Sequence, residues 1–141
     1  MENVVRQILL TDSRIDVGLL FGSHVSGKTT PMSDVDIGII TNVDMPLIDL
    51  GYLTYQLENA MDSDGVDLVI LNDAYKRNPR FAFNVISNCR VVFCRKEDVL
   101  VDFKRNTFLY YFDTQPLREM VDAALRRRIA AGKFGETNYV G

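Results

Sequence analysis

The sequence is poor in the residues that mark secreted proteins and zinc-binding proteins. Its 141 residues include no tryptophan, one histidine (His24) and two cysteines, Cys89 and Cys94. The cysteines lie five apart in a predicted strand, where side chains at that spacing point to opposite faces, so we expect two reduced thiols and no disulfide. One histidine and two cysteines are also too few for a typical zinc site.

Long apolar runs and an excess of positive charge are also missing. The longest runs, such as Val17 to Phe21, end well short of the about 18 residues that a membrane-spanning helix needs. The segment from Met1 to Arg6 lacks the pattern of an export signal, so we expect a cytoplasmic protein. The formal net charge of −3 argues against direct binding to nucleic acid, because that affinity rests on a surplus of Lys and Arg.

The residues that are present fit one globular domain with alternating helices and strands. Hydrophobic residues make up 47% and charged residues 25%, close to the average for globular proteins. Periodicity predicts strands at residues 15–21, 35–40, 66–71 and 90–93. It predicts helices at residues 4–9, 46–61, 81–87 and, in two pieces that restart at Pro116, 97–131. We expect an α+β fold whose core covers residues 1–95, with residues 96–141 as a C-terminal helical extension of the same domain.

The most informative stretch is Gly22-Ser23, followed after ten residues by Asp34-Val35-Asp36. A glycine in such a turn lets the backbone approach a phosphate, and Ser23 offers a hydroxyl and an N–H. The segment from Gly22 to Thr29 also matches the P-loop pattern G-x-x-x-x-G-K-T. A P-loop needs a helix at this point, but only five residues separate Thr29 from the next predicted strand. We therefore interpret the glycine, lysine and threonine as incidental loop residues.

Three aspartates form the candidate catalytic set. Asp34 and Asp36 are two apart, so both side chains point to the same side of their predicted strand. Asp67 adds a third acid in the apolar run that follows, with Asp64 as a nearby competitor. Three carboxylates in a small patch repel one another unless cations bridge them. Two Mg²⁺ ions would do so and would stabilise an in-line displacement at phosphorus.

The pattern G-S-x10-D-x-D, with a third acid in the strand Val66-Asp67-Leu68-Val69-Ile70-Leu71, resembles the DNA polymerase β-type nucleotidyltransferase superfamily. The short chain is similar to its minimal nucleotidyltransferases, the antitoxins that accompany HEPN-type ribonuclease toxins. The resemblance covers roughly residues 1–95. It implies a small mixed sheet flanked by helices, and ATP as substrate with two Mg²⁺ ions. It further implies a protein adenylyltransferase that moves AMP to a tyrosine hydroxyl of its cognate toxin, within a hetero-oligomer, and so silences the toxin.

The resemblance also implies the roles of individual residues. Asp34 and Asp36 would bridge both metals, and Asp67 would bind the catalytic metal and assist deprotonation of the acceptor hydroxyl. Gly22 and Ser23 would hold the β- and γ-phosphates. Lys28 is a candidate for neutralising triphosphate charge, with an ordinary surface lysine as the alternative.

Two other functions remain open at this point. One is an antitoxin that only binds its partner and keeps a vestigial site, although a binding module has no physical need for crowded like charges. The other is a nucleotidyltransferase that acts on a small-molecule hydroxyl. Arg126-Arg127-Arg128 is interpreted as the cationic last turn of a helix. The aromatic residues between Phe103 and Phe112 leave two alternatives: they belong to the core, or some of them form an interface with the toxin.

Overall fold

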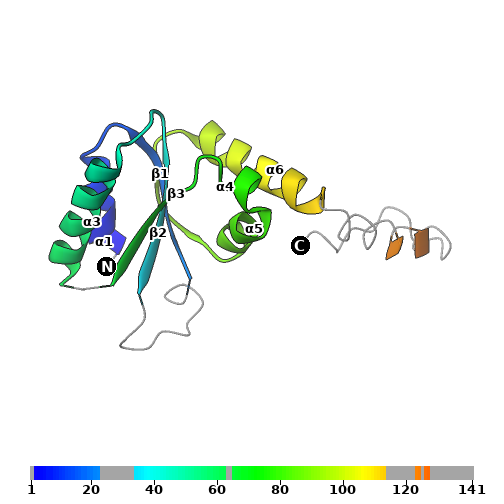
Figure 1. Ribbon diagram of the computed structural model, residues 1–141, viewed down its shortest axis with the longest axis horizontal. Coiled ribbons are helices and arrows are strands. Elements are labelled where there is room, and N and C mark those ends of the chain that lie inside the picture. The colour runs from blue at the N-terminus through cyan, green and yellow to red at the C-terminus, as the bar shows by residue number, and fades with distance from the viewer. Residues whose placement is uncertain (1, 23–33, 63–64, 114–122, 125, 128–141) are drawn as a thin grey trace.

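The computed structural model describes residues 2–22, 34–62, 65–113, 123–124 and 126–127 (Figure 1). The strands of this part are β1 (Ile15–Phe21), β2 (Val35–Thr41), β3 (Val66–Ile70) and β4 (Arg90–Cys94). Its helices are α1 (Glu2–Leu10), α3 (Leu47–Met61), α4 (Ala74–Arg77), α5 (Pro79–Ser87) and α6 (Glu97–Phe112). The fold is therefore α+β, as the periodicity predicts.

The described strands form one mixed sheet in the order β3-β2-β1-β4. Strand β1 runs antiparallel to both β2 and β4, whereas β2 and β3 are parallel. A parallel pair requires a crossover connection, and α3 supplies it between β2 and β3. This topology brings the last residues of β1 and the first residues of β2 and β3 together at one end of the strands.

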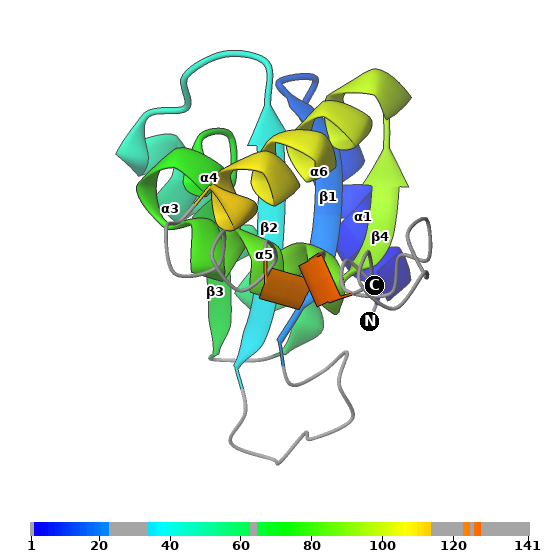
Figure 2. The same ribbon diagram turned by 90° about the vertical axis from the view of Figure 1, so that its right-hand side faces the viewer.

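Helices cover both faces of the sheet. Helices α1 and α3 pack on one face, where Leu9, Ile37 and Leu57 belong to one buried cluster. Helices α4, α5 and α6 pack on the other face, where Leu19 and Val85 belong to a second cluster. Figure 1 shows these two helical layers on either side of the strands, and Figure 2 shows α6 crossing in front of the sheet. The central strand β1 is buried along its whole length, as expected for a strand covered on both faces.

The side chain of Asn72 extends the parallel pairing beyond the last residue of β3. Its carbonyl oxygen accepts a hydrogen bond from the Thr41 backbone N–H at 2.9 Å, and its amide nitrogen donates to the Thr41 carbonyl at 2.7 Å. Thr41 is buried, so both backbone groups need partners inside the protein. Asn72 therefore fixes the end of β2 that lies far from the candidate site.

The aromatic residues of α6 pack mainly against α5. The ring of Phe83 stacks on that of Tyr111, with centroids 4.0 Å apart, and makes edge contacts with Phe108 and Phe112. Phe103 is buried in the core. Most of this aromatic group therefore holds two helices together, which is the core alternative stated above.

The remaining local predictions can be compared directly with the structure. Both cysteines are free thiols, as expected. The expectation that they point to opposite faces is wrong, because Cys89 precedes β4 and both thiols border the same core cluster. A register shift in β4 also breaks the regular alternation. Residues 123–124 and 126–127 are helical, whereas the predicted restart at Pro116 and the end at Gly132 lie outside the described residues. In the described part, no helix is long and apolar enough to span a membrane.

Candidate active site

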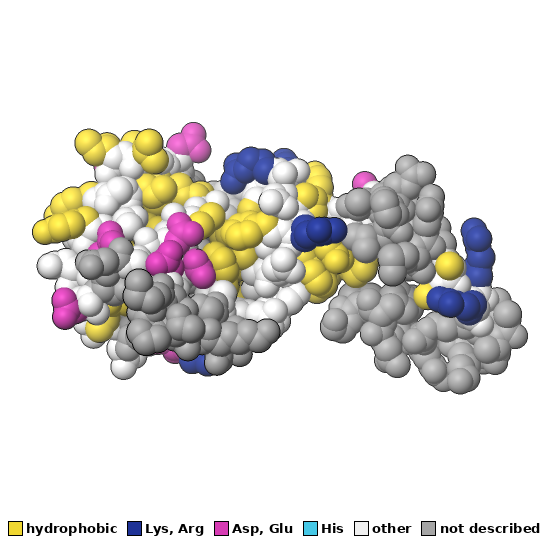
Figure 3. Space-filling model, turned by 60° about the horizontal axis from the view of Figure 1, so that its bottom comes forward, with side chains coloured by type: hydrophobic (Ala, Val, Ile, Leu, Met, Phe, Trp, Pro, Cys, Tyr) yellow, Lys and Arg dark blue, Asp and Glu magenta, His cyan; other side chains and the backbone are white. Residues whose placement is uncertain are grey.

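The register of the sheet places the three predicted acids on one face. Asp36 of β2 is paired with Phe21 at the end of β1 and with Asp67 of β3. Paired residues on neighbouring strands direct their side chains to the same face, so the Asp36 and Asp67 carboxylates lie side by side. Asp34 immediately precedes β2 and, two residues from Asp36, shares that face. Viewed toward this end of the sheet, acidic side chains form a group on the surface (Figure 3).

Two glycines make room for these carboxylates. Gly22 follows β1 with a φ of 83°, a left-handed conformation that side chains disfavour. A Cβ atom at Gly22 would overlap Oδ2 of Asp36, and a Cβ at Gly65 would overlap Oδ1 of Asp34. Each acid is thus packed against a position that has no side chain. The turn after β1 and the loop before β3 are shaped around Asp36 and Asp34.

The donor set suits a hard divalent cation. Asp34 and Asp67 are exposed and Asp36 is half-buried, so oxygen ligands of the kind that Mg²⁺ prefers reach the surface at one sheet edge. The side chains are adjacent but not drawn together: within the described ranges, no three His, Cys, Asp or Glu residues form a group that could hold a metal ion as it stands.

Several predicted site residues lie outside the described residues. Ser23 and Lys28 fall in the segment from 23 to 33, as do His24 and Ser33, and Asp64 falls in the gap before β3. Their predicted roles stay predictions. Of the predicted site residues, the structure brings together Gly22, Asp34, Asp36 and Asp67.

A cavity beside Gly22 was not predicted from the sequence. It has a volume of about 220 Å³ and is lined by Phe21, Gly22, Phe81, Asn84, Val85 and Asn88. The ring of Phe81 makes an edge contact with that of Phe21, with centroids 5.8 Å apart. Asn84 of α5 and Asn88, which follows the last residue of that helix, are both exposed.

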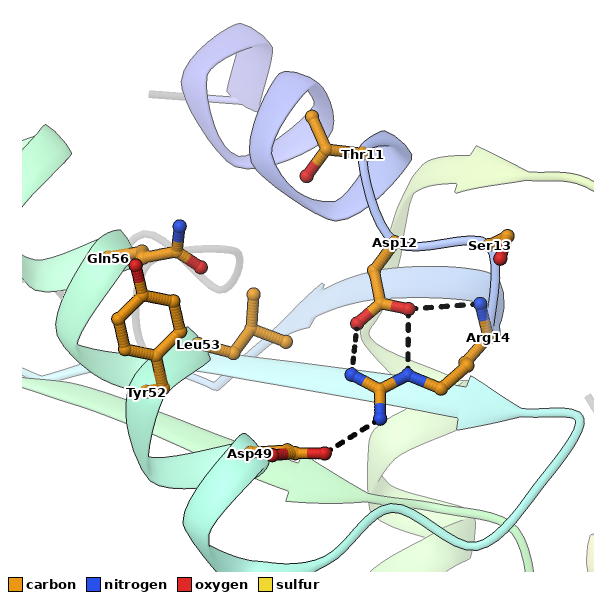
Figure 4. Close-up of a pocket in the computed structure, with 8 residues that line it drawn as sticks. All are labelled: Thr11, Asp12, Ser13, Arg14, Asp49, Tyr52, Leu53 and Gln56. Carbon is orange, nitrogen blue, oxygen red and sulfur yellow. Dashed lines mark hydrogen bonds and ion pairs between the residues drawn. The ribbon is translucent and has the colours of Figure 1, made fainter.

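The described cavities also include one of about 410 Å³ at the opposite end of the sheet (Figure 4). There, Arg14 donates hydrogen bonds to both carboxylate oxygens of Asp12, at 2.9 and 2.7 Å, and to Asp49 at 2.8 Å. These bonds lower the pKa of the Asp12 carboxyl, because they favour its charged form. Tyr52 and Gln56 of α3 line the other wall. The cavity adjoins the start of β1 and is remote from the three acids.

The sheet topology excludes the P-loop alternative. In a P-loop protein, the strand before the glycine-rich loop belongs to a parallel sheet and leads into a helix. Here β1 is antiparallel to both of its neighbours. The match from Gly22 to Thr29 is therefore a coincidence of composition, as the spacing to the next strand predicts.

A mixed sheet with Gly22 at the end of one strand and acids at the start of the next two is the arrangement of a nucleotidyltransferase. Residues 3–98 match the family described as polymerase β, nucleotidyltransferase, and the chain belongs to this family. No curated protein matches the chain significantly.

Solved structures share the fold at low sequence identity. A chain of a toxin–antitoxin complex with AMP-PNP is 23% identical, with a TM-score of 0.67 over 87% of this chain and 97% of that one. A chain of the MntA–HepT toxin–antitoxin complex is 21% identical, with a TM-score of 0.61 over 87% and 95%. A structure from Shewanella oneidensis is 20% identical, with a TM-score of 0.63 over 89% and 95%. The polymerase β-like nucleotidyltransferase fold predicted from the motif is thereby confirmed.

Proposed function

We propose that the protein is an antitoxin that transfers AMP from ATP to a tyrosine hydroxyl of a cognate HEPN-type ribonuclease toxin. The observation that carries this proposal is the alignment of Asp36 with Asp67 across β2 and β3, with Gly22 packed against Asp36. Family membership supports nucleotidyl transfer as the chemistry. The likeness to chains of toxin–antitoxin complexes, one of them solved with AMP-PNP, supports the partner and the nucleotide.

In this proposal the phosphates lie at the Gly22 turn and the nucleoside extends into the cavity next to it. Asn84 and Asn88 offer amide donors and acceptors at the rim of that cavity. Phe81 offers an aromatic surface for a nucleobase. ATP would thus lie along the end of β1, with its α-phosphorus near the acids.

The acids would supply the metal ligands. Asp34 and Asp36 would hold two Mg²⁺ ions and Asp67 would hold one, and bound Mg²⁺ neutralises phosphate charge and favours the oxyanion of the acceptor. The tyrosine oxygen forms a bond to the α-phosphorus while the bond to the β-phosphate oxygen breaks. Pyrophosphate leaves, and Asp67 assists removal of the phenolic proton.

The test is incubation of the protein with α-labelled ATP, MgCl₂ and a HEPN-type protein that copurifies with it. We expect label on the partner, and none with the Asp34→Ala/Asp36→Ala variant or with EDTA. If the wild-type protein transfers no label but neutralises the partner as well as that variant does, the protein only binds its partner. If label appears on a small hydroxylated compound instead, the acceptor assignment is wrong.

A further inference from the structure

Helix α3 carries an apolar stripe that faces away from the sheet. Leu47, Ile48, Tyr52 and Tyr55 are 83%, 80%, 64% and 62% exposed. At about 100° of rotation per residue, these four side chains and Gly51 lie on one side of the helix, opposite its buried leucines. Single exposed apolar residues are ordinary, but four on one side of one helix form a continuous patch of the kind found at protein interfaces.

Gly51 lies in the middle of this stripe, and packing within the chain does not require a glycine there. A Cβ atom at this position would meet no heavy atom within 4 Å. Glycine also disfavours helix formation, so alanine would fit the isolated protein better. A residue without a side chain is useful where another backbone must approach closely. The flat centre of the stripe therefore suits a surface covered by a second polypeptide.

The electrostatic surroundings of the stripe are acidic. Helix α3 carries Asp49 and Glu58 and has no Lys, Arg or His, and Asp44 and Asp62 flank it in the sequence. Glu58 continues the stripe toward the C-terminal end of α3, and Asp62 follows as the residue that caps the helix. The end of the molecule that holds α1 and α3 shows hydrophobic and acidic side chains in Figure 3. Arg14, the cation of the neighbouring cavity, is paired with Asp12 and Asp49.

We propose that this face of α3, made of Leu47, Ile48, Gly51, Tyr52 and Tyr55, docks a basic partner protein. An apolar helix of the partner crosses Gly51, and its Lys or Arg side chains face the surrounding acids. A second copy of this chain is a poor occupant, because it would bring two acidic surfaces together. The proposal rests on the proposed function, since it identifies the partner with the toxin: a protein that cleaves RNA needs cations of its own to hold the RNA backbone.

The docking face and the candidate active site are separate. Helix α3 packs on one face of the sheet, whereas Asp36 and Asp67 lie on the face that α4, α5 and α6 cover. The stripe also lies at the N-terminal half of α3, near the end of β2, while the acids lie at its beginning. A partner held on α3 thus leaves the carboxylates open to ATP, and docking can be measured without catalysis.

The test measures binding of the HEPN-type protein that copurifies with this chain, by calorimetry with the separated proteins, without ATP, at low and high salt. The variants are Gly51→Leu and Tyr52→Ala. The matched control is Ala60→Leu. It enlarges another small exposed residue of α3, on the side of the helix opposite Gly51. We expect Kd to rise by about tenfold or more in both variants and to stay unchanged in the control. Added salt should weaken wild-type binding.

Folding and catalysis are followed separately in the same variants. Gly51→Leu should melt no lower than the wild-type protein, because leucine favours helix and its Cβ meets no neighbour. Both variants should bind ATP as the wild-type protein does. The docking proposal is overturned if both variants bind the partner normally, or if the wild-type protein does not bind it. It is also overturned if sedimentation shows a wild-type dimer that Gly51→Leu dissociates. Absence of AMP transfer with normal docking would overturn only the proposed function.

Discussion

Replacement of Gly22 by alanine tests the geometry of the candidate site most directly. Gly22 has a φ of 83°, and left-handed backbone costs about 1–2 kcal/mol for a residue that carries a Cβ. The added Cβ would also overlap Oδ2 of Asp36, so this carboxylate has to move. We expect unfolding to require about 1–3 kcal/mol less free energy. We expect nucleotidyl transfer to fall by about 100-fold, because that is the usual effect of a 1 Å misplacement of a catalytic group.

Gly18→Ala, in the strand that precedes Gly22, provides the control. A Cβ at Gly18 would lie 2.8 Å from Cδ1 of Leu9 and 3.0 Å from Cε1 of Phe93, so it overpacks the other face of the sheet. The loss of stability should again be about 1–3 kcal/mol. The acids are untouched, so the transfer rate per folded molecule should match that of the wild-type protein. Urea denaturation and transfer of label from α-labelled ATP measure the two quantities. If Gly22→Ala loses no more activity than Gly18→Ala, the assignment of Asp36 to the site is wrong.

Three further predictions concern stability and reactivity. Asn72→Ala should lower the free energy of unfolding in urea by about 1–3 kcal/mol, since it leaves buried backbone groups of Thr41 without partners; an unchanged midpoint would contradict this. Arg14→Met should destabilise the protein at neutral pH. The pKa of Asp12 is lowered from 3.8 in the folded state. The difference in free energy of unfolding between the wild-type protein and the variant should therefore be full above pH 3.8 and disappear as the pH falls further. A stability difference that persists in acid would refute this prediction. Burial raises the pKa of the Cys89 thiol. Its alkylation by iodoacetamide near neutral pH should therefore be slower than that of the amino acid cysteine in solution, and it should accelerate in alkali. Mass spectrometry measures both rates.

The sequence predicts the helices and strands of this fold better than it predicts which strands lie side by side. Strands β1 and β2 were predicted almost to the residue, because an apolar run between turn residues needs no distant information. Helix α4, of four residues, was missed, since a single turn shows no periodicity. The position of β4 beside β1 was not predicted either, because strand order depends on contacts between segments far apart in the chain.

The candidate site divides in the same way. The spacing of Asp34 and Asp36 predicts that they share a face, and the parallel register adds Asp67 as their neighbour. The packing of Gly65 against Asp34 could not be predicted, because it depends on how the loop before β3 crosses the start of β2. Nor could the cavity that Asn84 and Asn88 line, which needs α5 to lie beside the end of β1. The roles of Ser23 and Lys28 stay predictions.

Strand β3 is an edge strand of the described sheet, and it carries the exposed charge of Asp67. An edge strand is a template for pairing with another molecule. A charge on it opposes pairing between two copies, because like charges would then lie beside each other. Asp67 would then serve solubility as well as chemistry. Variants that neutralise it have to be checked for self-association, since fibrous or amorphous aggregates would imitate a catalytic defect.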